Sequence, residues 1–151
     1  VQDDLKEIYT ELEKTDAIIL GSPIYFGDVS GEMRSFLERL LFPYLVYDNP
    51  SKSMFARKIR TAWIYTMGIP EDLVTQFGYD RLFESNERVM RLIFGASQSL
   101  MSYDTLQFAD YSKIVHGFDV KQKKQRRRQV YPEDCRKAFD LGAAMADALL
   151  P

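Results

Sequence analysis

Cysteine is nearly absent from this chain, and its scarcity excludes several kinds of site. Cys135 is the only cysteine among 151 residues, so no disulfide can form within the chain. For the same reason, no cluster of cysteines within these residues can bind zinc or iron and sulfur. A single cysteine is typical of a protein in a reducing compartment. Because no base accompanies it in the sequence, Cys135 is expected to be a buried small residue rather than a nucleophile.

Long apolar runs and histidine are also scarce. No apolar stretch approaches the roughly 20 residues needed to span a bilayer, and no basic segment followed by an apolar one opens the chain. These observations favour a cytoplasmic protein. The one histidine, His116, has no visible acid partner or nucleophile, so we expect a surface or turn residue rather than a catalytic one.

Neither sign of charge predominates over the whole chain, but the charge is unevenly placed. The formal net charge is −2, which gives no overall argument for binding nucleic acid or a membrane surface. The exception is KQKKQRRRQ, residues 121–129, which could attract nucleic acid. We favour a solvated loop preceding Pro132, because no aromatic residues are interleaved for stacking on bases. Attraction of the phosphates of a nicotinamide cofactor, or contact with an acidic neighbouring subunit, remains open.

The most informative stretch is residues 16–41. Its four apolar residues Ala17–Leu20 show no polar alternation, which predicts a parallel strand covered on both faces. Pro23 keeps the preceding residue out of helical angles, so we expect an extended aromatic loop over residues 24–27. Ser30 then caps a helix whose apolar residues recur at helical spacing. The stretch therefore predicts a strand, a loop and a helix.

The rest of the chain repeats this alternation. Its pattern predicts strands over 59–67 and over 102–111, the latter with Leu106 and Phe108 inward. It predicts helices from Asp3 or Asp4 to Thr15, over 71–78, over 81–95 and from Pro132 onward. Residues 43–58 are predicted to form a connecting loop. Alternating strands and helices favour an α/β fold with a parallel sheet between helix layers. Ligands bind such sheets at the carboxyl ends of the strands.

The sequence also predicts which aromatic and apolar residues outside residues 16–41 are buried. Trp63 is expected in the core, and Tyr44 and Tyr47 are expected to anchor the loop over 43–58. The apolar surface of the helix over 81–95 is broad, which hints at a second buried face, as at a subunit interface. The final helix is expected to bury one face, made of Cys135, Ala138, Phe139, Gly142, Ala146, Leu149 and Leu150.

The segment GSPIYFGDVSGEMRSFLER, residues 21–39, resembles the segment by which flavodoxin-like NAD(P)H-dependent FMN reductases hold the flavin ring. The iron-sulfur flavoproteins are part of this family. Weaker similarity runs through Met67-Gly68, residues 77–80 and the C-terminal helix. The resemblance implies a three-layer flavodoxin-like fold and a flavin site formed by the loops 21–28 and 66–69. The residues it assigns to the cofactor are Ser22, Pro23, Ile24, Tyr25, Phe26, Gly27, Thr66, Met67, Gly68 and Ile69.

The resemblance also implies where the chain lies in that fold. In the strand order 2-1-3-4-5, Ala17–Leu20 would be the third strand, so the central strand and its phosphate-binding loop are expected before Val1. We therefore expect a single flavodoxin-like domain over 1–151 that is incomplete at its N-terminus. Iron-sulfur members carry a cysteine motif in that upstream region, so the presence of a cluster stays open.

The chemistry expected from these residues belongs to a cofactor. No pair of carboxylates, metal-ligand spacing or nucleophile-base set is evident in the sequence, and no catalytic residue is assigned. The resemblance implies an NAD(P)H oxidoreductase that passes hydride through FMN to a quinone, nitro, azo, flavin or protein acceptor. It also implies a homodimer or homotetramer, and we expect neither nucleic acid nor a membrane as a partner. A flavin-binding electron carrier without an NAD(P)H site, or an interaction module that has lost the cofactor, remains an alternative.

Overall fold

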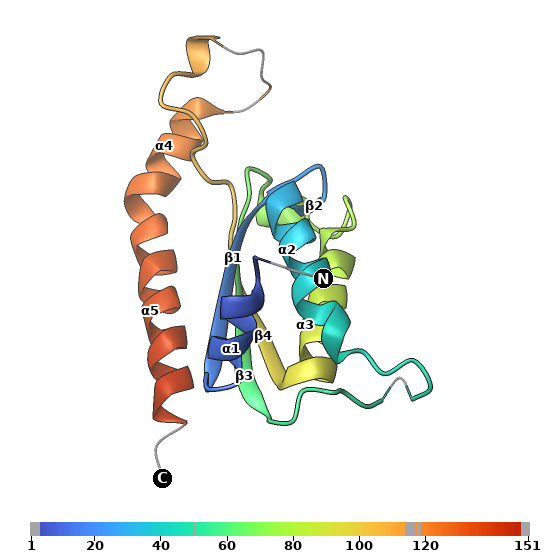
Figure 1. Ribbon diagram of the computed structural model, residues 1–151. Helices are drawn as coiled ribbons and strands as arrows, with labels where there is room; N and C mark the ends of the chain where they lie inside the picture. The colour runs from blue at the N-terminus through green and yellow to red at the C-terminus, as the bar shows by residue number, and fades with distance from the viewer. Residues whose placement is uncertain (1–3, 50, 114–116, 118, 149–151) are drawn as a thin grey trace.

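The computed structural model describes residues 4–49, 51–113, 117 and 119–148 (Figure 1). The expectations for Asp3, His116, Leu149 and Leu150 fall outside these ranges. The elements follow in the order α1 (Lys6–Leu12), β1 (Ala17–Tyr25), β2 (Asp28–Val29), α2 (Gly31–Leu41), η1 (Phe42–Tyr44), β3 (Ile59–Thr66), η2 (Glu71–Leu73), α3 (Tyr79–Phe94), β4 (Gly95–Ser102), η3 (Tyr111–Lys113), α4 (Val120–Gln129) and α5 (Tyr131–Asp147).

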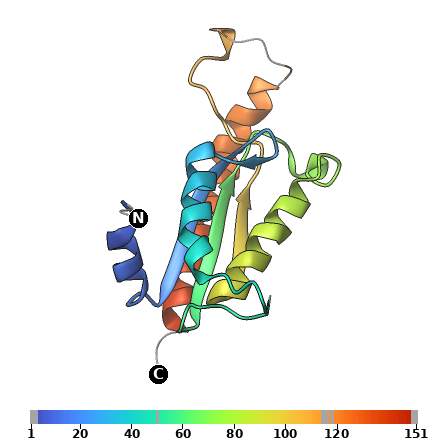
Figure 2. The ribbon, with the colours of Figure 1, turned by 45° about the vertical axis from the view of Figure 1, so that its right-hand side comes forward.

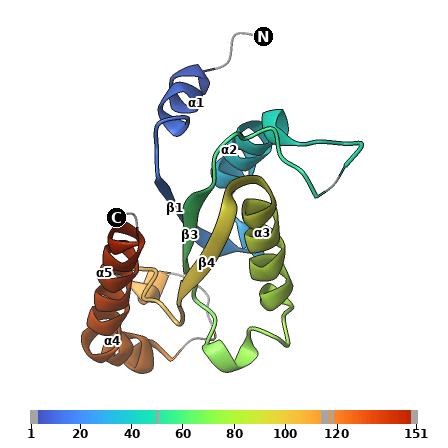
Figure 3. The same ribbon diagram turned by 90° about the horizontal axis from the view of Figure 1, so that it is seen from below.

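The described strands form one sheet in the order β2-β1-β3-β4. β1 and β3 are parallel, as are β3 and β4, and only the short β2 runs antiparallel. Helices α2 and α3 lie on one face of the sheet and α5 lies on the other (Figures 1 and 3). Figure 2 shows α2 and α3 both in front of the sheet, one toward each of its edges, with α5 behind the sheet. The three-layer α/β architecture expected from the sequence is therefore confirmed.

β1 is longer than expected. The chain remains extended through Pro23 to Tyr25, and Ile24 and Tyr25 pair with Val29 and Asp28 of β2. The expected loop is thus a β-hairpin, because proline and the preceding residue both prefer extended angles. The expectation that both faces of this strand are covered is wrong. Ile19 is 45% exposed, because α5 packs chiefly against β4 and leaves that face of β1 open.

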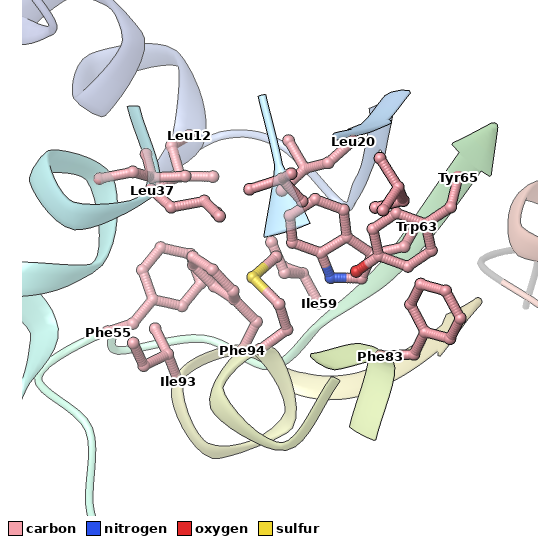
Figure 4. Packing of buried hydrophobic residues seen from close by; sticks show 14 of the residues in the cluster. Leu12, Leu20, Leu37, Phe55, Ile59, Trp63, Tyr65, Phe83, Ile93 and Phe94 are labelled. Atoms are coloured by element: carbon pink, nitrogen blue, oxygen red, sulfur yellow. The ribbon is translucent and has the colours of Figure 1, made fainter. Parts of the chain in front are cut away.

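The core lies between the sheet and α2 and α3, and it is aromatic (Figure 4). The rings of Trp63 and Tyr65 stack at 5.1 Å between centroids, and Phe83 stacks on the other side of Tyr65 at 4.8 Å. Phe94 at the end of α3 meets Phe55 edge to face at 4.9 Å. The prediction that Trp63 is a core residue is confirmed, since none of its surface is exposed.

The last strand was predicted in the wrong place. β4 spans Gly95–Ser102 and follows α3 directly, whereas residues 103–110 form a loop in which Phe108 is exposed. The sequence GASQSLMS has little strand preference of its own. It is extended because all eight residues pair in register with β3, from Ile59 with Gly95 to Thr66 with Ser102.

The basic stretch is a helix, α4, and not the solvated loop that we favoured. Asp119 caps it by accepting hydrogen bonds from the amides of Lys121 and Gln122, and Lys123 is only 2% exposed. The buried face of α5 also differs from the expected one. It carries Asp134 and Met145, whereas Cys135 is exposed and Phe139 is 76% exposed. The apolar spacing of α5 was misleading because this helix is held partly by polar contacts.

Two further expectations are resolved by burial. Phe83, Met90 and Phe94, which broaden the apolar surface of α3, are all buried in the core, so that surface is filled within one chain. In the connecting loop, Tyr44 packs edge to face against Phe55 at 5.2 Å and anchors the loop as expected. Tyr47 is 79% exposed and does not anchor the loop to the core.

Candidate cofactor site

The site lies at the carboxyl ends of β1 and β3. These strands pair up to Pro23 and Thr66, so the segments that follow both strands emerge side by side. Convergence of this kind is typical of ligand sites in open α/β sheets, because several loops present side chains and backbone groups to the same space.

The hairpin after β1 places two aromatic side chains over this edge. Phe26 and Gly27 form its turn with positive φ values of 52° and 82°. A side chain at Gly27 would meet the ring of Tyr79 at 3.3 Å, which explains the glycine there. Tyr25 is 55% exposed and Phe26 is fully exposed at the tip, so the turn displays aromatic surface instead of burying it.

Ser22 connects the strand to the following helix. Its hydroxyl accepts a hydrogen bond from the amide of Ser30 at 3.0 Å, and the Ser30 hydroxyl accepts one from the amide of Met33 at 3.3 Å. This confirms Ser30 as the N-cap of α2. Ser22 is buried, and its side chain is engaged in this joint.

The segment after β3 is held by the loop after β4. The amide of Thr105 donates to the carbonyl of Met67 at 2.9 Å, and the amide of Asp104 donates to the carbonyl of Ile69 at the same distance. The side chain of Gln107 lies so close to Gly68 that an added Cβ would be 2.5 Å from its nitrogen. Gly68 is therefore where the two loops approach most closely.

α4 completes this edge through Lys123. The ammonium of Lys123 donates to the carbonyl of Gly68 at 2.8 Å and to the carboxylate of Asp104 at 2.5 Å. A buried charge is tolerated only when it is paired and hydrogen-bonded, and these partners meet that condition. Lys123 thus ties a helix distant in sequence to the segment that follows β3.

A cavity of about 840 Å³ occupies the space between these segments. It is mostly apolar, and the exposed rings of Phe26 and Phe77 lie on its wall together with Gly68. Six of the residues predicted from the sequence line it: Ile24, Tyr25, Phe26, Met67, Gly68 and Ile69. Pro23 and Thr66 line a neighbouring cavity, whereas Ser22 and Gly27 line neither of these two.

Sequence reasoning missed the part of the wall that comes from the loop after β4 and from α4. The missed lining residues include Asp104, Gln107, Phe108, Asp119, Gln122 and Lys123. The sequence pattern predicts a strand where this loop lies and favours a solvated loop where α4 lies, with attraction of nicotinamide-cofactor phosphates by the basic stretch left open, so no residue of either was assigned to the flavin site. One available signal was Asp119, an N-cap residue just before the basic stretch.

Both carboxylates that line the cavity are already engaged. Asp104 is paired with Lys123, and Asp119 accepts the first amides of α4 at 2.9 and 3.1 Å. Neither is therefore placed as a free general base. Beneath the site, burial raises the pKa of Tyr65, whose hydroxyl accepts a hydrogen bond from the amide of Asn86. These features fit a site that binds a reactive group rather than one that supplies it.

The described ranges contain no group of three or more histidine, cysteine, aspartate or glutamate side chains placed to hold a metal ion. Among the same residues, no helix combines the length and apolar character needed to cross a membrane.

Residues 1–71 match the family model of NADPH-dependent FMN reductases. An iron-sulfur flavoprotein of Archaeoglobus fulgidus is 42% identical over 43 residues, which are 28% of this chain and 19% of that protein. An iron-sulfur flavoprotein of Methanocaldococcus jannaschii is 46% identical over 37 residues, 24% of this chain and 19% of that protein. The matched segments thus span about a fifth of these relatives. The resemblance to the FMN reductase family is confirmed.

The fold has a solved counterpart. An NAD(P)H:quinone oxidoreductase from Methanothermobacter marburgensis superposes with a TM-score of 0.59 at 14% identity. The superposition covers 74% of this chain and 56% of that one. At this identity the likeness concerns the fold alone, and it supports the flavodoxin-like class.

Proposed function

We propose that this chain forms the flavin-binding part of an FMN-dependent NAD(P)H oxidoreductase. One observation carries the proposal. The segment matched by the FMN reductase family includes β1, its hairpin and the segment after β3, and these converge on the largely apolar cavity at the carboxyl edge of the sheet. The residues implied by the resemblance are therefore neighbours in space.

The residues present fit an isoalloxazine ring. Such a ring is flat and largely apolar on its faces and polar along one edge. The cavity offers exposed aromatic side chains from the hairpin and from Phe77, and Gly68 lies in its wall with the Gln107 side chain packed against it. Gln107 adds an amide that can pair with a polar edge. Tyr25 and Phe26 would cover the ring, while Met67, Gly68 and Ile69 would form its floor.

Bound FMN would supply the redox chemistry, taking hydride from a nicotinamide cofactor and passing electrons to an acceptor. The chain's own residues would bind and orient the reactants. The exposed rings would exclude water from the reacting face, and Lys123 would hold the Gly68 carbonyl in place. We infer a quinone, nitro, azo, flavin or protein acceptor, as the resemblance implies.

We further infer that a second copy of the chain contributes to covering this region, as in the homodimer or homotetramer expected from the sequence. The exposed rings of Tyr25, Phe26, Phe77 and Phe108 around one cavity support this inference. Light scattering during size-exclusion chromatography tests it, and a monomer at every concentration would contradict it. A cytoplasmic location remains a prediction from the sequence.

The proposal is tested by the absorption spectrum of the purified protein with added FMN, followed by anaerobic NADPH or NADH. Bound flavin that is bleached by either nucleotide supports it. Failure to bind FMN in excess contradicts it, and a flavin band that neither nucleotide changes would indicate an electron carrier instead.

Phe26→Ala is expected to weaken FMN binding by about tenfold, given that ring stacking contributes about 0.5–1.5 kcal/mol beyond the area it buries. Phe139→Ala, which removes another exposed ring, on α5 and outside the cavity lining, is the matched control and should bind FMN normally.

A further inference from the structure

A second cavity of about 770 Å³ adjoins the candidate flavin site. It is lined by Pro23 and Thr66 at the ends of β1 and β3, by the loop 105–109, and by Arg127 and Tyr131 from α4 and α5. Ile24, Tyr25, Gln107 and Phe108 line both cavities. The two spaces are therefore neighbours, separated by the strand end and the loop after β4. We call the second one the Arg127 cavity.

The Arg127 cavity differs from the first in its charge. Among the residues that the structure describes, Arg127 is the only charged side chain that lines it, and none of these lining residues is a carboxylate. The first cavity contains Asp104 and Asp119 along with Lys123. An arginine facing a cavity without a counterion creates a local positive potential, which favours an anionic occupant.

Arg127 is exposed, whereas the two more buried cations of α4, Lys123 and Arg126, are already engaged. Lys123 is paired with Asp104, and Arg126 donates to the carboxylate of Asp134 at 2.8 Å with only 14% of its side chain exposed. Within the described residues, the contact recorded for Arg127 is with the ring of Tyr131, 3.7 Å from its guanidinium carbon. No carboxylate of the described residues pairs with Arg127, so its exposed N–H groups remain able to bind a ligand.

The ring of Tyr131 also orients Arg127. Stacking restrains the planar guanidinium by its face and leaves its edge, which carries the N–H donors, available. That edge matches two oxygens of a phosphate group in a bidentate arrangement. Thr66 lines the same cavity, and its hydroxyl can donate a further hydrogen bond.

We propose that the Arg127 cavity is a phosphate subsite, in which Arg127 binds a phosphate group of a nucleotide cofactor whose reactive ring lies in the adjoining cavity. The identity of that nucleotide rests on the proposed function. The phosphate-binding loop of the fold is expected before Val1, so the favoured source of the phosphate is the nicotinamide cofactor. Recognition of the FMN phosphate by Arg127 uses the same chemistry and is the other outcome of the test. The experiment distinguishes them.

The test compares Arg127→Gln with Arg128→Gln, which removes the same charge from the next residue of α4, outside the lining of the cavity. Calorimetric titration measures the dissociation constants of FMN, riboflavin and 2′,5′-ADP, a probe that carries the phosphates of the NADPH adenosine without the nicotinamide. Binding of 2′,5′-ADP requires no flavin, so the subsite is tested even if the proposed oxidoreductase function fails.

We expect Arg127→Gln to weaken at least one phosphorylated ligand by roughly tenfold or more, as loss of a charge-assisted hydrogen bond implies. Arg128→Gln should change the same constant by less than about twofold, because Arg128, although exposed like Arg127, does not line the cavity and would act only at a distance through screened solvent. Weaker FMN binding with unchanged riboflavin binding assigns the phosphate to FMN. Weaker 2′,5′-ADP binding assigns it to the nicotinamide cofactor. The proposal is overturned if the two variants behave alike toward both phosphorylated ligands, or if the unmodified protein binds neither.

Discussion

The helices on the two faces of the sheet are attached to it by different kinds of contact. On one face, α2 and α3 enclose a core of stacked and edge-to-face rings that includes Trp63, Tyr65 and Phe94. On the other face, α4 and α5 are attached through buried polar groups. Ser102 donates to Asp134 at 2.7 Å, and Lys123 is paired with Asp104. The same sheet thus uses apolar burial on one side and directional polar contacts on the other.

This difference has a physical consequence. Apolar burial scales with area and tolerates modest rearrangement, so the aromatic face contributes most of the free energy of folding. A buried ion pair gains little over an apolar pair of similar size, but removing one partner leaves the other buried and uncompensated. The polar face therefore contributes mainly geometry, and it places Lys123, Arg127 and the loop after β4 beside the two cavities at the carboxyl edge of the sheet.

The largest effect is expected from truncating the aromatic face. Phe94→Ala removes a fully buried ring that contacts Tyr44 and Phe55, and it should lower the free energy of unfolding by about 3–5 kcal/mol. Urea denaturation followed by fluorescence measures this. Phe139→Ala, on an exposed site of α5, should change it by less than about 0.5 kcal/mol. Similar losses for the two variants would contradict the assignment of the core.

The next effect comes from breaking the polar face. Lys123→Met leaves Asp104 buried without its partner and should cost about 3 kcal/mol. Adding Asp104→Asn should recover part of that loss, because the uncompensated charge is removed while a polar group stays near the Gly68 carbonyl. Hydrogen exchange should show faster exchange at α4 and the loop after β4 than in α3. If the double variant is less stable than Lys123→Met alone, the cost does not arise from the unpaired carboxylate.

The smallest effect is expected where a polar group lies inside the aromatic face. Tyr65→Phe removes the hydroxyl that accepts a hydrogen bond from Asn86 and should cost about 1 kcal/mol at neutral pH. Burial raises the pKa of Tyr65 above its ordinary value of 10.0, so the folded state favours the neutral phenol. Stability from this group is complete below about pH 10 and is lost as the pH rises toward the folded pKa.

Tyr65→Phe should therefore reduce the fall in stability between pH 9 and 11, measured as urea midpoints. Some of the fall should persist, because burial also raises the pKa of Tyr44 and Tyr103. An unchanged slope in this pH range would mean that Tyr65 ionises equally well in both states.

The elements that sequence reasoning placed well are those whose stability comes from local chemistry and apolar patterning. Ser30 at the start of α2, the apolar run in β3 and the buried Trp63 all follow from short-range signals. The candidate site was found for a different reason, since its residues carry the resemblance to FMN reductases. Six of them line one cavity.

The misplaced elements depend on partners distant in sequence. Residues 102–111 alternate polar and apolar side chains, yet they form a loop, because β3 is already paired along its whole length by residues 95–102. Cys135 and Phe139 fall on an apolar spacing, yet α5 buries Asp134 instead, where Ser102 and Arg126 reach its carboxylate. Neither the pairing of β3 with β4 nor the contacts of Asp134 can be predicted from the local sequence pattern.

The sequence alone was enough to predict the α/β class, the strand and helix within residues 16–41, the burial of Trp63 and the hairpin residues that resemble a flavin-binding segment. Those features follow from backbone preferences and from the segregation of apolar side chains, which neighbouring residues specify. The three-dimensional structure was needed to show that the run of lysines and arginines is a helix in which Lys123 is buried and paired, Arg126 is paired and Arg127 lines a cavity. The reason is that a buried charge is stable only beside its counterion, and Asp104 and Asp134 are brought to α4 by the folded chain.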